Sequence, residues 1–356
     1  MEISKELQII GTEDGFFGQK RPVYNTPITQ KENYLLALKG EGLWTPILSQ
    51  QVIFSPKIIP DSISRGFVVD NDTIDNATEA GGPDMFGVAW EWVPQVNGSM
   101  VRSEGPQMLA DIAKWEEVLK FPDPDEWDWE GSAAANKNCF SDLVPLQIWF
   151  QNGLFERLVS LLGFGEAAVA LADEEQKPHV HAFLDRLCAL YENIFSRFKK
   201  HYGFDVLFFH DDWGGQYAPF FSLDTVREML LPYLKRLVDF THGLGVVFEF
   251  HSCGKNEMLV PAMIEAGVDI WAGQKINDHL SLLEKYAGQI VFDVWPNLVM
   301  GEEYTIEEVE NATIEFLDAF EPWLENIVVA DTRQTEDKRH KLYELVYTRS
   351  RVKLAR

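Results

Sequence analysis

The sequence predicts an α/β protein, a (β/α)8 TIM barrel with an elaborated N-terminal region. Eight apolar segments are separated, over most of the chain, by helical patterns, and this alternation is typical of a parallel sheet. The predicted strands are residues 45–49, 84–91, 144–150, 206–209, 246–250, 268–271, 290–294 and 327–330. Eight units favour a closed barrel, with a doubly wound open sheet as the alternative. No G-x-G-x-x-G follows any strand, so dinucleotide binding has no support.

Length, composition and charge indicate a soluble cytoplasmic protein. With 356 residues and 46% hydrophobic residues, we expect a single domain over residues 1–356, with residues 1–40 as an N-terminal extension. No apolar run approaches the roughly 18 residues of a membrane span, and the first residues carry no apolar signal segment. Three cysteines make no disulfide framework, which fits a reducing compartment. The net charge of -25 argues against nucleic acid as a partner.

Taken in order, the remaining elements support the alternation. A short helix at 31–38 ends at Gly40, and irregular residues 50–80 form an elaborated loop. An Asn-Gly turn at 97–98 follows the second predicted strand. Ser222 caps one later helix, and Thr305 with Glu308 forms a capping box that opens another. The later helices are predicted at 109–120, 154–171, 178–202, 222–243, 256–267, 279–286, 305–320 and 336–347.

The strand at 246–250 ends abruptly in His-Ser-Cys-Gly. Residues two apart in a strand face the same side, so His251 and Cys253 should point the same way, with Glu249 beneath them. An imidazole and a thiolate side by side suit Zn²⁺. The alternative is a hydrogen-bonded core histidine beside a buried thiol.

Polar residues follow the other apolar strands as well, and barrel enzymes carry their chemistry at these ends. A catalytic zinc commonly has three protein ligands, so a third must join His251 and Cys253. Asp331, Glu249 and Gln274 are the candidates, and Asp331 is favoured. Asp212 could orient a ligand or act as a general acid or base, and His210 faces the same side or serves as a framework residue. The strand ends carry Gln151 and Asn152, His210 to Asp212, His251 and Cys253, Gln274, Asp293 with Trp295, and Asp331.

Several motifs together resemble a known family. They are Asp-Asp-Trp-Gly-Gly-Gln at 211–216, Pro-Tyr-Leu-Lys-Arg at 232–236, His-x-Cys-Gly at 251–254, Ile-Glu-Ala-Gly-Val-Asp at 264–269 and Glu-Lys-Tyr-Ala-Gly at 284–288. With weaker matches they span most of the chain from about residue 84 to 335. The chain resembles the uroporphyrinogen decarboxylase superfamily and, within it, the zinc-dependent corrinoid methyltransferase branch of O-demethylase type. The family fold is a (β/α)8 barrel.

The resemblance also implies a metal site. In this branch a His-x-Cys pair and a later cysteine bind zinc at the barrel mouth, and His251 and Cys253 match the pair. The later cysteine is missing, because the last strand ends in Val-Ala-Asp-Thr at 329–332. Asp331 is the obvious stand-in, and Gln274 falls near the place of an exchangeable oxygen ligand.

The resemblance implies methyl transfer between a small donor, such as a methoxylated aromatic, and a corrinoid (cobalamin) carried by a partner protein. Zinc would act as a Lewis acid or would hold a thiolate acceptor. We expect catalytic roles for Asp212, His210 and Glu249. Trp90, Trp92, Trp213 and Trp295 could sandwich an aromatic donor, or they could simply pack the barrel against its helices. The residues expected to contact the cofactor are Gln151, Asn152, Trp213 and Trp295.

Two alternatives stay open. One is decarboxylation of a tetrapyrrole, as in the superfamily's decarboxylases, which hold many carboxylates with an arginine-rich N-terminal segment. Only Arg21 and Arg65 occur in the first 100 residues here, and the chain is acidic, so this alternative is disfavoured. The other is a non-catalytic protein that binds a corrinoid or tetrapyrrole on the same fold.

Overall fold

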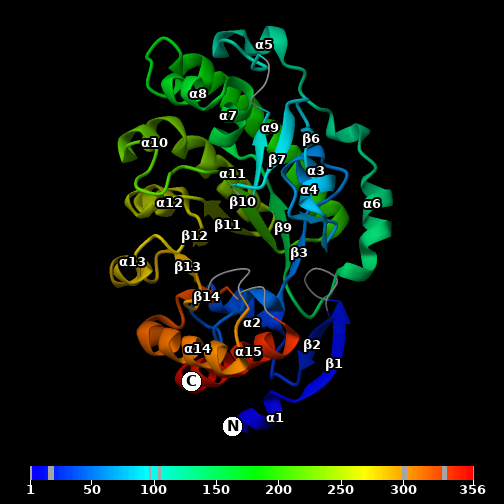
Figure 1. Ribbon diagram of the computed structural model, residues 1–356, viewed down its shortest axis with the longest axis vertical. Helices are drawn as coiled ribbons and strands as arrows, with labels where there is room; N and C mark the ends of the chain where they lie inside the picture. Colours follow the sequence, from blue (N-terminus) through cyan, green and yellow to red (C-terminus); the bar gives the residue numbers. More distant parts are fainter. Residues whose placement is uncertain are drawn as a thin grey trace.

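A curled sheet of parallel strands forms the centre of the molecule (Figure 1). The computed structural model describes residues 2–14, 20–95, 98–102, 106–298, 303–330 and 335–355. Within these ranges the sheet has seven strands in the order β14-β13-β12-β11-β10-β9-β3. Ile47, before β3, forms a parallel bridge with Val329 at the opposite edge, so the arrangement is barrel-like. The strands are β3 (Val52–Phe54), β9 (Leu146–Phe150), β10 (Val206–His210), β11 (Val247–Ser252), β12 (Ile270–Gly273), β13 (Val291–Val294) and β14 (Ile327–Val329).

The six strands from β9 to β14 lie where the sequence predicts them, within two residues at each end. Most of their residues are buried, as expected for a sheet that is covered on both faces. Such strands give continuous apolar runs, which is why the sequence located them well.

The first two predicted strands need correction. Residues 84–91 are wrong as a barrel strand, because β7 (Ala89–Val93) pairs with β6 (Gly82–Pro83) and β8 (Gly98–Val101) in a separate antiparallel sheet. Only Trp90 of β7 is buried, so this strand lacks the second covered face of a barrel strand. The first strand begins at Val52 instead of residue 45, after a 3-10 turn at Leu48–Gln50. The described parallel sheet therefore has seven strands where eight were expected.

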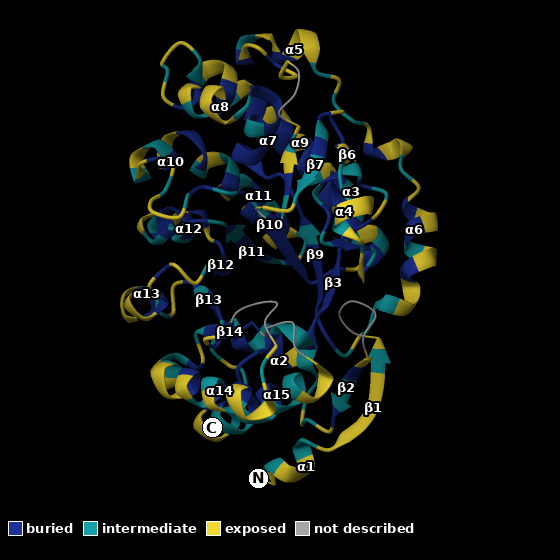
Figure 2. Ribbon diagram, in the orientation of Figure 1, coloured by how far each residue is buried: buried dark blue, intermediate teal, exposed yellow. Residues whose placement is uncertain are grey.

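Helices pack against the outer side of the sheet and expose their other faces (Figure 2). The predicted helix at 154–171 is two helices, because Gly163 adopts a φ of 82° between them. The predicted helix at 222–243 also breaks, at Leu230, and the next helix begins at Leu231 with Pro232 in its first turn. The helices are α7 (Leu154–Leu162), α8 (Phe164–Ala170), α9 (Lys177–Tyr202), α10 (Leu223–Met229), α11 (Leu231–Gly243), α12 (Val260–Ala266), α13 (His279–Tyr286), α14 (Ile306–Phe320) and α15 (Glu336–Lys353).

The capping signals behave as the sequence predicts. The Thr305 hydroxyl accepts a hydrogen bond from Glu308 N, and the Glu308 carboxylate accepts one from Thr305 N, which completes the capping box of α14. Ser222 caps α10. None of the helices in the described part of the chain is both long and apolar enough to cross a lipid bilayer.

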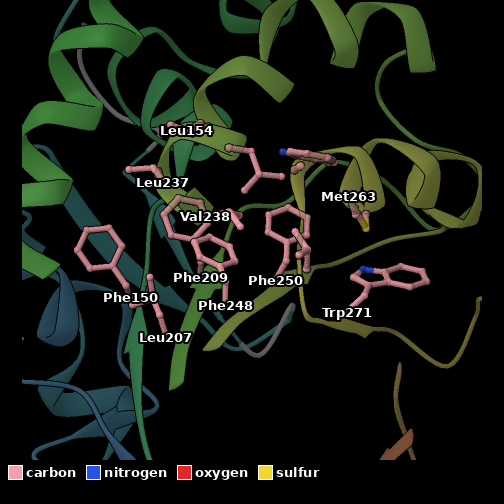
Figure 3. Packing of buried hydrophobic residues seen from close by; sticks show 14 of the residues in the cluster. Phe150, Leu154, Leu207, Phe209, Leu237, Val238, Phe248, Phe250, Met263 and Trp271 are labelled. Atoms are coloured by element: carbon pink, nitrogen blue, oxygen red, sulfur yellow. The ribbon is translucent and has the colours of Figure 1, made fainter. Parts of the chain in front are cut away.

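Aromatic side chains from neighbouring strands form the core between the sheet and its helices (Figure 3). Phe209 of β10 lies 5.5 Å, between ring centroids, from Phe248 of β11. Phe250 of β11 lies beside these two rings, and Leu237 of α11 and Met263 of α12 pack over the three aromatic side chains. Burying each of these side chains stabilises the fold by about 1.5–3 kcal/mol. Their alternate neighbours on the same strands face the barrel interior, which is where the polar residues lie.

The N-terminal elements close the other end of the barrel. Tyr34 of α2 (Gln30–Ala37) is buried against the beginnings of three strands, at Val206, Ile270 and Val328. The hairpin of β1 (Ile9–Asp14) and β2 (Lys20–Tyr24) follows α1 (Ile3–Glu6). Both termini lie near α14 and α15, at the bottom of the view in Figure 1, and Arg351 of α15 pairs with Glu6 at 3.0 Å. Tyr34 therefore fills the amino end of the barrel, and the carboxyl ends of the strands lie at its other end.

A segment between β3 and β9 lies beside the carboxyl ends of the strands. A buried ion-pair network fixes it: Arg157 of α7 pairs with Asp84 at 2.6 Å and with Asp61. Asn152 also donates to Asp61, at 2.6 Å. The segment contains α3 (Pro60–Arg65), β4 (Val68–Val69), β5 (Asp72–Thr73), α4 (Asn76–Glu79), the antiparallel sheet, α5 (Trp115–Val118) and α6 (Trp129–Asn136).

Candidate metal centre

The pairing of β10 with β11 brings four side chains together at the carboxyl ends of the strands. His210 and His251 are direct partners in the parallel register. Asp212 and Cys253 follow them by two residues, so their side chains lie on the same face as the two histidines. The ligand atoms of these four half-buried residues all lie within 4.8 Å of one another. We call this set the metal group.

The spacing of the metal group is compatible with zinc. His251 Nε2 lies 3.3 Å from Cys253 Sγ, and His210 Nε2 lies 3.8 Å from Asp212 Oδ1. Ligands at about 2.0–2.3 Å in a tetrahedron are roughly 3.3–3.7 Å apart, so small side-chain movements would close the set on one ion. One sulfur, two imidazoles and one carboxylate are donors that zinc accepts.

Both histidines are oriented by a hydrogen bond outside the metal group. His210 Nδ1 lies 2.7 Å from Glu156 Oε2, which directs Nε2 toward the group. Arg65 in turn pairs with Glu156 at 3.0 Å. The His251 ring forms a hydrogen bond with the backbone of Ala272 on β12. Carboxylate and carbonyl partners of this kind are typical of metal-binding histidines.

The two aspartates of the Asp-Asp-Trp motif face opposite ways. Asp211 is fully buried and accepts hydrogen bonds from the backbone N–H groups of Phe155 and Glu156 at 3.1 and 2.8 Å. It thereby satisfies donors at the N-terminus of α7 and positions Glu156. Asp212 faces the metal group, and its Oδ1 accepts from Cys253 N at 2.6 Å.

The protonation states determine which protons a bound metal would displace. Burial and the charge of His210 lower the pKa of His251 to about 4, so its imidazole is neutral near pH 7. Burial by itself would lower the pKa of His210, but the carboxylates of Glu156 and Asp212 raise it well above its usual value. Burial raises the pKa of the Cys253 thiol. His210 and Cys253 therefore each hold a proton that a bound metal would displace.

The turn after Cys253 is rigid because two backbones meet there. Gly254 has a φ of 97°, and a Cβ atom at this position would collide with the backbone of Gly214. Gly254 N donates to Gln274 Oε1 at 2.9 Å. Gln274, a predicted metal ligand, therefore uses its side-chain oxygen to hold this turn. Asp331, the favoured third ligand, lies outside the described residues.

Glu249 lies beneath the metal group, as its spacing predicts. It is buried, and its Oε2 accepts from Gln147 Nε2 at 2.6 Å. Burial and the nearby charge of Asp293 raise the pKa of Glu249 well above its usual value. This shift favours the protonated acid in the barrel interior, and the catalytic role of Glu249 stays a prediction.

Of the residues expected to contact a cofactor, two are fully buried and one is half-buried. Asn152 is fully buried at a φ of 61° and donates to Asp61. Trp213 is also fully buried, and its indole N–H donates to Asp211 at 2.8 Å. Trp295 is half-buried just after β13. Their roles in cofactor binding stay predictions. Gln151, the fourth, accepts a hydrogen bond from Arg65, which also pairs with Glu156.

Sequence reasoning missed Glu156 and Arg65. Glu156 lies in the first turn of the helix that follows β9, and a carboxylate there is a recognisable signal beside a strand end. Arg65 had no such signal, because it reaches Glu156 only through the fold, 91 positions along the chain.

The fold and the metal group define a barrel-like α/β protein with a candidate metal centre at the carboxyl ends of its strands. No protein-family model matches the sequence, and no curated protein matches it. The structure is similar to that of a methyltransferase from Methanosarcina mazei, with a TM-score of 0.58 and 12% identity over 92% of this chain and 100% of that chain. At this identity the similarity shows a methyltransferase-like fold.

More remote solved structures share less of the fold. A dihydropteroate synthase from Xanthomonas albilineans, solved with 4-aminobenzoic acid, has a TM-score of 0.30 and 15% identity over 46% of this chain and 58% of that chain. An intracellular xylanase from Thermoanaerobacterium saccharolyticum has a TM-score of 0.35 and 12% identity over 59% of this chain and 72% of that chain. Neither similarity is high enough to carry an argument about function.

Proposed function

We propose that this protein is a zinc-dependent methyltransferase that moves a methyl group between a small donor and a corrinoid carried by a partner protein. The observation that carries the proposal is the metal group at the carboxyl ends of the strands, where barrel enzymes place their chemistry. The sequence resemblance to corrinoid methyltransferases and the similarity in fold to a methyltransferase both agree with it.

Three members of the metal group are the proposed zinc ligands: His210, His251 and Cys253. Because His210 Nδ1 is hydrogen-bonded to Glu156, Nε2 is the atom of His210 that would bind zinc. Three protein ligands leave one coordination position open, as in catalytic zinc sites. The chemistry that zinc supplies when bound is polarisation of a leaving oxygen or retention of a thiolate acceptor. Asp331 stays a prediction as a further ligand.

Asp212 is the proposed proton acceptor beside the open position. Burial would raise its pKa, but the charge of His210 lowers it below its usual value. The carboxylate is thus ionised at neutral pH, and its Oδ1 is held in place by Cys253 N. It can take the proton of a thiol acceptor or return one to a leaving oxygen.

The two N-terminal arginines give no support to tetrapyrrole decarboxylation. Arg21 is buried at the β1–β2 hairpin, where it pairs with Glu13 at 2.6 Å. Arg65 pairs with Glu156 beside the metal group. These two side chains therefore do not gather into a cluster that could hold many carboxylates.

Methyl transfer to cob(I)alamin tests the proposal. The purified zinc-loaded protein is mixed with reduced cob(I)alamin and with methoxylated aromatics, methanol, methylamines or methyl thioethers, and formation of methylcobalamin is followed by absorbance. We expect transfer from at least one donor class. Cys253→Ala should slow it at least about 100-fold, equivalent to roughly 2.7 kcal/mol of activation free energy, with the circular dichroism unchanged. Cys139→Ala, which changes a half-buried thiol outside the metal group, is the matched control. Equal rates for Cys253→Ala and wild type would refute the proposal.

A further inference from the structure

A buried hydrogen-bond donor without a partner lies next to the metal group. Gln151 follows the end of β9 and is only 5% exposed. Its Oε1 accepts from Arg65 Nε at 3.3 Å, which fixes the orientation of the amide. Among the described residues, nothing accepts a hydrogen bond from its Nε2. Leaving a buried donor unpaired costs free energy, so such a group calls for a partner that binds from outside the chain.

Arg65 is held rigidly beside this amide. Its Nη2 pairs with Glu156 at 3.0 Å, and its guanidinium lies over the Trp90 ring at 4.8 Å. Its hydrogen bonds to side chains in the described structure use Nε and Nη2. Glu156 also bonds His210, so one carboxylate links Arg65 directly to the metal group.

We infer that Arg65 and Gln151 form an anchor for a small substrate that carries one carboxylate, bound beside the metal group. A guanidinium and an amide N–H side by side match the two oxygens of a carboxylate. Because Glu156 already offsets the charge of Arg65, the pair suits a single negative charge and not a polyanion. This inference rests on the proposed function, because the anchored molecule is the methyl donor or acceptor of that reaction.

The anchor also explains why the orphaned amide is tolerated. Preorganised binding sites keep donors that are satisfied only when the ligand is present, and this lowers the stability of the free protein. Gln151→Glu removes the amide donor and keeps an acceptor for Arg65 Nε in a side chain of the same shape. Its added negative charge repels a carboxylate, and circular dichroism checks that the variant is folded.

Calorimetric binding of 3-methoxybenzoate and of uncharged methoxybenzene to the zinc-loaded protein tests the anchor. Wild type should bind the carboxylate at least tenfold more tightly than the uncharged ether. Gln151→Glu and Arg65→Met should each lose at least tenfold in carboxylate affinity and leave the affinity for the ether unchanged. Arg102→Met is the matched control, because Arg102 is an exposed arginine that pairs with Glu91 at 3.7 Å on β7.

The outcomes separate the anchor from the reaction. Unchanged carboxylate binding in Gln151→Glu, as would occur if the carboxylate bound only the zinc ion, would overturn the anchor. So would equal affinity of wild type for the two ligands. If Arg65→Met fails to fold, the carboxylate affinity of Gln151→Glu tests the anchor by itself, since this substitution preserves the shape of the side chain. Because binding requires no turnover, carboxylate preference without methyl transfer would refute the proposed function only.

Discussion

Replacing Glu156 by glutamine should weaken zinc binding about 5- to 30-fold without unfolding the protein. Glu156 accepts a hydrogen bond at 2.7 Å from His210 and is largely buried. A hydrogen bond to a charged group contributes about 1.5–3 kcal/mol, and a neutral one contributes about 0.5–1.5 kcal/mol. The difference of about 1–2 kcal/mol corresponds to the stated loss. It also lies close to the roughly 10- to 100-fold losses that follow changes to the partners of metal ligands.

The assay is competition for zinc with a chromophoric chelator at fixed pH, with thermal unfolding as a check on folding. Asp269→Asn is the matched control: His242 Nε2 lies 2.7 Å from Asp269 Oδ2, the same contact at a site outside the metal group. This control should leave the zinc affinity unchanged. An affinity of Glu156→Gln within twofold of wild type would refute the idea that His210 is a ligand oriented by Glu156.

Two further predictions concern pH and the buried network. Zinc affinity should rise about 100-fold per pH unit between about pH 5.5 and 6.5, because the raised pKa values of His210 and Cys253 mean that binding displaces two protons. His251, with a pKa of about 4, is already neutral in this range. A rise in zinc affinity of tenfold or less, measured by chelator competition across this range, would contradict the prediction. Arg157→Met should destabilise the protein by about 3–5 kcal/mol in urea unfolding, because it leaves the carboxylates of Asp61 and Asp84 buried without their cation. A decrease in the free energy of unfolding below about 1 kcal/mol would show that the network does not hold the fold.

The sequence predicts the second half of the fold well because its strands are buried on both faces. β9 to β14 appear as apolar runs, and the residue that follows each run marks the carboxyl end where the metal group lies. The alternation of side chains along a strand also places His251 and Cys253 together and puts Glu249 below them. These inferences depend only on local periodicity, which the sequence carries directly.

The rest depends on contacts between distant parts of the chain. β7 contains an apolar aromatic run, but its partners are β6 and β8, and its burial is one-sided. His210 is placed beside His251 by the register of β10 against β11, which the sequence does not specify. Arg65 and Glu156 meet only because α3 and α7 pack near the same strand ends. Local sequence patterns do not predict contacts between residues so far apart in the chain.

Metal content measured by elemental mass spectrometry tests the central claim most directly. The purified protein, loaded with zinc and then dialysed, is compared with the His251→Ala/Cys253→Ala double variant, whose fold is checked by circular dichroism. The account predicts about one zinc per chain in the wild type, as expected for a single tetrahedral site, and loss of that zinc in the folded variant. A wild type that retains no zinc, or a variant that retains as much as the wild type, would contradict the claim that these residues form a zinc centre.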